Sequence, residues 1–240
     1  MTEGRAPNGE NRLLNALRRG NSDHELGPVE LVSLTLKQEL YTPNMPIEHV
    51  YFPVNGVVSM LAQLEEGLLV EVATVGNEGM IGLPLFLGTN TTPGKAFSQV
   101  PGDAYQMPAP EFKRHIEEPS NFTRVLHRYT QALVTQISQG NACNRVHNER
   151  QRCARWLLLT HDRVGSDEFP LTQEFLGQML GVRRAVIEEI AGQLERAGTI
   201  DYTEGVVRVL NRPGLEAESC LCYSIIRDEY ERMYSAFQKE

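Results

Sequence analysis

The segment that most restricts the fold of this chain is residues 171–190. Thr172 is a favourable N-cap residue, and Glu174 close behind it suits the positive end of a helix dipole. Gly181 lies where the chain must turn sharply, which glycine does at little steric cost. Apolar residues at helical spacing on both sides of this glycine predict two amphipathic helices. The residues expected to be buried are Phe175, Leu176, Met179, Val186, Ile187, Ile190 and Leu194.

Two short apolar stretches follow, at residues 198–202 and 206–210, and they flank a turn at residues 203–205. Alternation about a glycine-containing turn predicts a β-hairpin. Helix, tight turn, helix and hairpin in this order are typical of a winged helix-turn-helix, which binds DNA. A helical hairpin that contacts another protein is the alternative interpretation. The exposed face of the second helix is expected to carry Arg184, Ala185, Glu188 and Glu189.

Residues 30–110 have a different sequence pattern from the helical segments, because short apolar stretches are separated there by glycine and proline. Residues 56–64 alternate as a strand does, Glu65-Glu66-Gly67 supplies a turn, and residues 68–75 form a second strand. Several strands at short spacing with turn residues between them predict a sandwich or jelly roll. The chain is therefore expected to have a β-rich first half and a helical second half.

A long helix is expected between these halves, from Ser120 to Arg145, with Ser120 as its N-cap. At about 1.5 Å per residue it would be roughly 39 Å long. A long helix with a narrow apolar seam usually packs against something, and a symmetric partner is the simplest choice. A brace against the protein's own sheet is the alternative. The seam consists of Phe122, Leu126, Tyr129, Leu133, Ile137 and Gly140.

The charge balance bears on a nucleic-acid partner. The formal net charge is −8, which taken alone argues against one. Net charge affects steering rather than fold, however, and a local patch can outweigh it. Between residues 146 and 212, nine arginines oppose ten acidic residues, which leaves about −1. We therefore expect any DNA binding to depend on a few exposed arginines.

The four cysteines, Cys143, Cys153, Cys220 and Cys222, are few for the length and fit a reducing compartment. Cys220 and Cys222 have one residue between them, whereas zinc ribbons usually have two or more and need a second pair. Cys143 and Cys153 are ten positions apart and offer no such pair. The sequence thus predicts ordinary thiols, no metal site and no cofactor.

Membrane and secretion signals are not expected. No run of eighteen apolar residues exists, and the first twenty residues lack an apolar core, which favours the cytoplasm and no membrane partner. Ser22, Asp23 and His24 are adjacent, but they lie on a polar stretch without the strained turn that presents a nucleophile. We expect a protein that is not an enzyme.

Several motifs together resemble the Crp/Fnr family of regulators. The sensory half is represented by Asn-Arg-Leu-Leu at 11–14, Val-Tyr-Phe-Pro at 50–53, Gly-Val-Val-Ser at 56–59 and residues 71–82. Residues 147–156 and 171–184 resemble the DNA-binding half. The resemblance implies an α+β fold with an N-terminal β jelly roll of the cyclic-nucleotide-binding-like kind. The implied segments are a tail with a short helix (1–25), the jelly roll (26–118), a dimerisation helix (119–145) and a winged helix-turn-helix with a C-terminal helix (146–240).

The same resemblance implies a homodimer that binds operator DNA, with RNA polymerase and a small-molecule effector as further candidate partners. A dimeric protein-interaction module on the same fold, with DNA binding lost, is the alternative. The residues that the resemblance and the helix pattern assign to double-stranded DNA are Thr172, Gln173, Gln178, Arg183, Arg184, Ala185, Glu188, Glu189 and Arg208.

The effector site departs from the family pattern. Family members that bind cyclic AMP use a glycine-rich turn, a glutamate for the ribose and an arginine for the phosphate. The turn is retained, but Leu83 stands where the glutamate is expected, and the only cation near the arginine position is Lys95. A lysine meets a phosphate as a point charge without a bidentate fork. We expect weak cyclic AMP binding, and another ligand or none remains open. The candidate pocket is Gly76, Glu78, Gly79, Gly82, Leu83 and Lys95.

Overall fold

The computed structural model describes residues 10–19, 27–65 and 68–238. Ser22, Asp23 and His24 lie outside these segments, as do two residues of the turn expected after position 64. No helix within the described segments is both long and apolar enough to cross a membrane.

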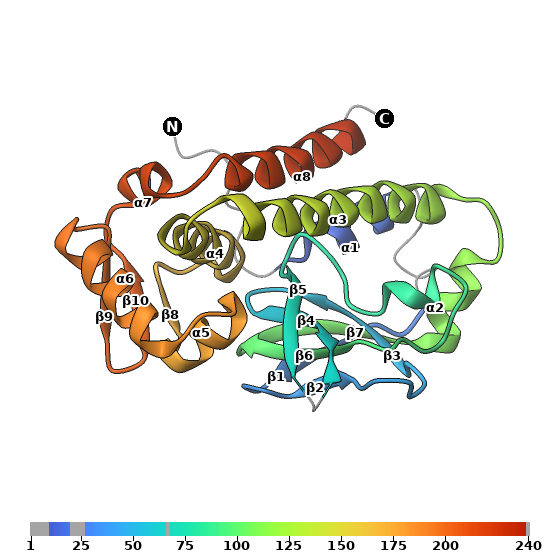
Figure 1. The fold of residues 1–240 in the computed structure, drawn as a ribbon. Helices are drawn as coiled ribbons and strands as arrows, with labels where there is room; N and C mark the ends of the chain where they lie inside the picture. The colour runs from blue at the N-terminus through green and yellow to red at the C-terminus, as the bar shows by residue number, and fades with distance from the viewer. Residues whose placement is uncertain (1–9, 20–26, 66–67, 239–240) are drawn as a thin grey trace.

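The N-terminal half consists of two antiparallel sheets, as the turn pattern predicts (Figure 1). One sheet has the strand order β1-β7-β3 and the other β2-β6-β4-β5. The predicted hairpin is the pair β4–β5, whose register runs from Val58 opposite Val75 to Gln63 opposite Leu69. The strands are β1 (Glu30–Leu34), β2 (Glu39–Tyr41), β3 (His49–Pro53), β4 (Val57–Gln63), β5 (Leu69–Val75), β6 (Lys95–Val100) and β7 (Gly102–Pro108).

Short helices flank these sheets. Helix α1 (Arg12–Arg18) begins at Asn11, whose side chain accepts a hydrogen bond from the Leu14 amide and donates to the carbonyls of Pro53 and Gly79. One buried side chain therefore caps the helix and fixes it to the jelly roll. A single 3-10 turn, η3 (Leu83–Leu85), follows the glycine-rich turn, and α2 (Ala109–Ile116) follows β7.

The predicted long helix is α3 (Asn121–Val146), which begins with a capping box formed by Ser120 and Thr123. Four residues of its apolar seam, Phe122, Leu126, Tyr129 and Leu133, are buried within the protomer, while Ile137 and Gly140 are half-buried. The Tyr129 hydroxyl donates to the Met80 carbonyl at 3.0 Å, which ties the seam to the jelly roll. The buried part of the seam therefore packs against the jelly roll of its own chain, which is the alternative interpretation, and not against a symmetric partner.

A second face of α3 is covered by the last helix, α8 (Cys222–Gln238) (Figure 1). Tyr230 donates to Gln136 at 3.0 Å, and the Arg128 guanidinium lies 5.4 Å from the ring centroid of Phe237. The start of α8 meets the end of α3, where Gln139 contacts Cys222, so the two helices are antiparallel. The sequence groups this helix with the DNA-binding half, whereas its apolar stripe packs on α3.

The C-terminal half follows α4 (Glu149–Val164) and contains the predicted two helices and hairpin. Its small sheet has the order β8-β10-β9. The elements are β8 (Glu168–Pro170), α5 (Gln173–Leu180), α6 (Arg184–Arg196), β9 (Ile200–Thr203), β10 (Val206–Val209) and α7 (Arg212–Glu218).

The two halves meet at a buried arginine of α4. Arg163 is 3% exposed and forms an ion pair with Glu78, its Nη2 lying 2.8 Å from Oε1. It also donates to Gln136 on α3 and to Thr74 on β5. Tyr234 on α8 donates to the Glu78 carbonyl at 2.6 Å. Four separate parts of the chain are thus joined at one point.

A second polar contact at this junction joins β5 to α4. The Trp156 indole N–H donates to Glu71 Oε1 at 2.8 Å, and the Ser59 hydroxyl donates to Oε2 at 2.8 Å. Burial raises the pKa of the Glu71 carboxyl from 4.5 to about 7, against the lowering effect of these two hydrogen bonds. Because folding favours the protonated carboxyl, the free energy of unfolding falls as pH rises from about 4.5 to about 7, and the Glu71 contribution is constant above that range.

We expect Glu71→Gln to remove this component of the pH dependence, since glutamine keeps the shape and does not ionise. A shift of this size corresponds to about 3 kcal/mol at most. Urea unfolding at several pH values between 5 and 8 measures it, and Glu30→Gln on exposed β1 is the control. Parallel stability curves for wild type and Glu71→Gln would contradict the assignment.

Candidate nucleic-acid interface

The geometry of the two-helix unit rests on three local features. The Thr172 hydroxyl accepts a hydrogen bond from the Phe175 amide at 3.2 Å and caps α5. Gly181 ends α5 with a left-handed φ of 67°, as the sequence predicts. Gly177 has a role that sequence analysis misses, because a Cβ there would lie 2.9 Å from the Val182 carbonyl oxygen. Only glycine at this position lets the turn lie so close to α5.

Helix α5 also contacts the sheet domain. The Phe175 ring meets the Phe97 ring of β6 edge-on, with 6.0 Å between their centroids. The helix-turn-helix is therefore held by both its own core and the jelly roll.

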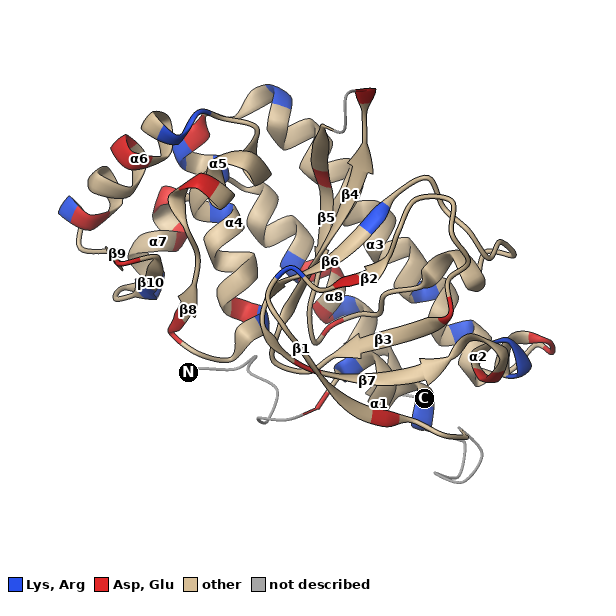
Figure 2. Ribbon diagram, turned by 90° about the horizontal axis from the view of Figure 1, so that it is seen from below, with Lys and Arg blue, Asp and Glu red and all other residues tan. Residues whose placement is uncertain are grey.

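Helix α6 buries Ile187, Ile190 and Leu194 and turns its opposite face to solvent. These three residues are buried as predicted, whereas Val186, also predicted to be buried, is half-buried. Figure 2 shows both signs of charge along α6. The exposed residues of this face are Arg183, Arg184, Ala185, Glu188 and Glu189.

Both glutamates of this face have a partner four residues away along the helix. Arg184 Nε lies 2.9 Å from Glu188 Oε1, and Gln193 donates to Glu189 at 3.2 Å. Exposed pairs four residues apart contribute only about 0.3–0.5 kcal/mol. Little free energy is therefore lost when Arg184 leaves Glu188 to contact a nucleic acid.

The remaining predicted contact residues lie on α5 and on the hairpin. Thr172 and Gln178 are exposed and Gln173 is half-buried. Arg208 on β10 is exposed and pairs with Glu168 at 2.6 Å. Whether these side chains touch DNA stays a prediction.

Several other arginines of this half have structural roles. Arg163 and Arg155 are buried. Arg150 pairs with Glu218 at 2.7 Å, and Arg212 pairs with Asp162 at 2.5 Å. These four arginines are therefore not readily available to a nucleic acid, which leaves few cations at the surface of this half.

The candidate effector residues are largely occupied by contacts within the chain. A Cβ at Gly76 would lie 2.5 Å from the Arg163 side chain, and one at Gly79 would lie 2.5 Å from the Tyr129 hydroxyl. Helices α3 and α4 therefore pack directly on the glycine-rich turn. The Glu78 carboxylate accepts from the Gly76 amide at 3.1 Å and from Arg163. An acidic side chain thus sits where the turn would present its amide to a phosphate.

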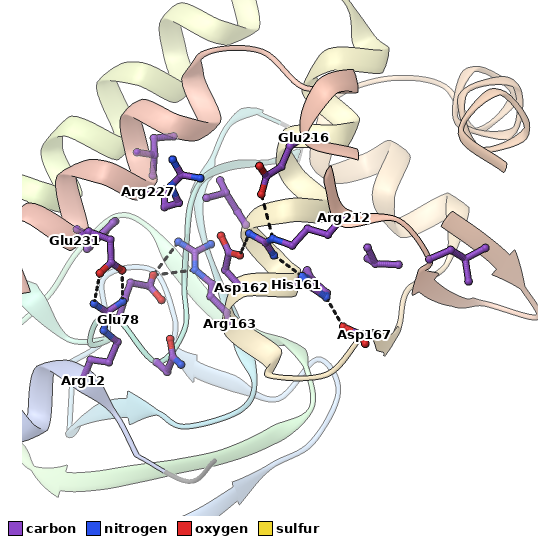
Figure 3. A pocket seen from close by; sticks show the side chains of 16 residues that line it. Arg12, Glu78, His161, Asp162, Arg163, Asp167, Arg212, Glu216, Arg227 and Glu231 are labelled. Carbon is purple, nitrogen blue, oxygen red and sulfur yellow. Dashed lines mark hydrogen bonds and ion pairs between the residues drawn. The ribbon is translucent and has the colours of Figure 1, made fainter. Parts of the chain in front are cut away.

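The other candidate effector positions do not converge on one cavity. Leu83 is buried, Gly82 has a left-handed φ of 103° against Val50, and Lys95 pairs with Glu39. Of the six candidates, Glu78 alone lines the cavity of about 900 Å³ that lies between α4, α7, α8 and this turn (Figure 3).

The charged side chains of that cavity pair with one another. Arg12 and Glu231 are joined by two hydrogen bonds of 2.7 and 3.0 Å. Arg212 contacts Asp162, Glu216 and His161 (Figure 3). A ligand would have to displace these ion pairs, and we assign no ligand to this cavity.

Comparison with known proteins identifies the helix-turn-helix domain. Residues 151–218 match the model of the Crp-like helix-turn-helix domain. No curated protein matches the chain in sequence.

Solved structures share the fold over most of the chain. A protein from Eubacterium rectale assigned to the Crp/Fnr family of transcriptional regulators is 15% identical, with a TM-score of 0.65, over 85% of this chain and 98% of the other. FixK2 from Bradyrhizobium japonicum is 16% identical, with a TM-score of 0.64, over 80% and 98%. TTHA1359, a Crp/Fnr regulator from Thermus thermophilus, is 21% identical, with a TM-score of 0.62, over 79% and 98%.

We expect cyclic AMP to bind weakly or not at all, because the Glu78 carboxylate occupies the glycine-rich turn and would repel a phosphate. Isothermal titration calorimetry of the purified protein measures this directly. A micromolar or tighter dissociation constant would contradict it.

Proposed function

We propose that this chain, a Crp/Fnr-type transcription regulator by its helix-turn-helix domain and its fold, binds operator DNA as a homodimer through α6. The observation that carries the proposal is the solvent-exposed face of α6 on a rigidly packed two-helix unit. A helix presented in this way fits the major groove, where base edges carry a distinct pattern of donors and acceptors.

Two residues of this face carry the proposed base contacts. Arg184, at the start of α6, has the planar fork that meets the O6 and N7 atoms of guanine. Glu189 lies on the same exposed face and can accept from the amino group of cytosine. Each such contact discriminates against the wrong base by about 1–3 kcal/mol.

Binding to random DNA should be feeble. Phosphate neutralisation supplies most non-specific affinity, and the log–log salt slope is roughly −0.9 per phosphate contact. The exposed arginines here are few, because Arg155 and Arg163 are buried and others are paired. Specificity therefore depends on a small number of contacts.

We expect Arg184→Ala to abolish the preference for operator over scrambled DNA, since it removes the bidentate base contact. Glu189→Gln should relax the preferred sequence and strengthen random-DNA binding, because it removes a negative charge from the face. Titration of both variants against operator and scrambled duplexes at several salt concentrations measures these effects.

Arg208→Ala serves as a contrast in the same titrations. As a proposed phosphate contact on the hairpin, it should weaken binding to both duplexes alike and reduce the salt slope by roughly 0.9. Unchanged operator affinity in Arg184→Ala would contradict the proposed use of α6. Absence of any operator-specific shift in the wild type would favour the protein-interaction module instead.

The proposed dimer uses the face of α3 that neither the jelly roll nor α8 covers. Val134 on this face is 50% exposed. Val70 and Val72 on β5, which packs beside α3, are each 40% exposed. Exposed apolar side chains on adjacent elements are typical of a protein–protein contact. Leu133 is 3% exposed, so a substitution there would disturb the core of the protomer itself.

We expect Val134→Asp to weaken the dimer at least tenfold, because a charge would be desolvated at the interface. Sedimentation velocity over a concentration series measures the monomer–dimer equilibrium. Leu31→Asp, at a side chain 56% exposed on β1, is the matched control and should leave the dimer unchanged. An equally stable dimer in both variants would place the interface elsewhere.

Control by a signal at the jelly roll completes the proposal. Glu78 and Glu71 belong to the turn and strand of the sheet domain, and both bond to α4. A change at the turn would therefore act on the first helix of the DNA-binding half. The chemistry of the effector is left open, and RNA polymerase is a partner implied by the resemblance alone.

A further inference from the structure

Three of the four cysteines come together at one place with a histidine. Cys143 lies near the end of α3 and His147 directly after it, whereas Cys220 and Cys222 lie at the start of α8. One sulfur or ring-nitrogen atom from each of the four residues lies within 4.8 Å of all the others. The spacing of the cysteines in the sequence predicts no metal site, so this grouping exists only in the folded chain.

Ordinary packing does not account for the cluster. Cys153 is part of the main hydrophobic core, where a thiol behaves as a small apolar side chain. Cys143, Cys220 and Cys222 instead form a separate buried cluster that contains no other residue type. They are 0%, 6% and 2% exposed. These three buried thiols thus lie together, apart from the main hydrophobic core.

Two distances within the cluster are close to those around one tetrahedral ion. With Zn–S of about 2.3 Å and Zn–N of about 2.0–2.1 Å, tetrahedral geometry puts two sulfurs about 3.8 Å apart and a sulfur and a nitrogen about 3.6 Å apart. The Cys143 and Cys220 sulfurs are 3.5 Å apart, and the Cys222 sulfur is 3.5 Å from His147 Nδ1. The ligands of an iron–sulfur cluster bind different irons, so their atoms would lie farther apart.

We propose that Cys143, His147, Cys220 and Cys222 bind one Zn²⁺ ion in a structural site. Three thiolates and one imidazole are a donor set that closed structural zinc sites use. The N-terminus of α8 favours the negative charge of the two thiolates beside it. The ion joins the start of α8 to the junction of α3 and α4, and so fixes α8 along α3.

Metal analysis of the purified protein is the first test. The full chain is produced with zinc, purified under reducing conditions without chelator, and analysed by inductively coupled plasma mass spectrometry. We expect about one zinc ion per chain in the wild type and in Cys153→Ala, whose thiol lies outside the cluster. Cys222→Ala and His147→Ala should bind zinc at least about 100-fold more weakly, since even the loss of an outer-shell partner costs 10–100-fold.

A measurement on the wild type alone guards against variants that fail to fold. After removal of zinc, Co²⁺ is titrated into the reduced protein, and the visible absorption bands of tetrahedral cobalt thiolate should saturate at an equimolar ratio. Chelation should also accelerate tryptic cleavage at Arg227 and Arg232 on α8, because that helix is no longer fixed at its start.

Three results would overturn the proposal. One is a wild-type protein that takes up neither zinc nor cobalt under reducing conditions. Another is equal metal content in Cys153→Ala and a well-folded Cys222→Ala. The third is a disulfide between Cys143 and Cys220 in freshly purified, non-reduced protein, detected by the mass of alkylated peptides.

Discussion

The buried ion pair between Arg163 and Glu78 is the interaction on which the relative placement of the two halves depends. A charge with 3% exposure is costly unless it is paired and its remaining donors are satisfied. Glu78, Thr74 and Gln136 satisfy the Arg163 guanidinium, and each belongs to a different element or turn from α4. To move α4 away from the jelly roll would leave that charge without partners. The first helix of the C-terminal half is therefore fixed to the glycine-rich turn of the jelly roll.

The long helix α3 packs against two neighbours within the protomer. Its apolar seam packs on the jelly roll through residues such as Tyr129, and its second face packs on α8 through Gln136 and Gln139. A third face with Val134 stays exposed. A helix that is already braced on two sides is ordered before any partner binds.

The surface of α6 combines few positive charges with exposed acids. Arg184 Nε lies 2.9 Å from Glu188 Oε1, and an exposed pair of this kind contributes little to stability. Under the proposed function, such a surface gains little from the phosphate backbone, and the base contacts supply the specificity. The buried and paired arginines elsewhere in this half, such as Arg163 and Arg212, have structural roles instead.

The sequence by itself determined the features that depend on near neighbours. Thr172 caps α5, Gly181 adopts the left-handed turn, and the stripe of Ile187, Ile190 and Leu194 fixes which face of α6 is exposed. Capping, turn chemistry and periodicity act within a few residues, so they can be recognised without a fold. Only the tertiary structure decided that α8 covers α3, that Glu78 and Arg163 fill the glycine-rich turn, and that Cys143 meets Cys220 across 77 positions. Such contacts depend on which surfaces of distant elements bury each other, and no local pattern carries that information.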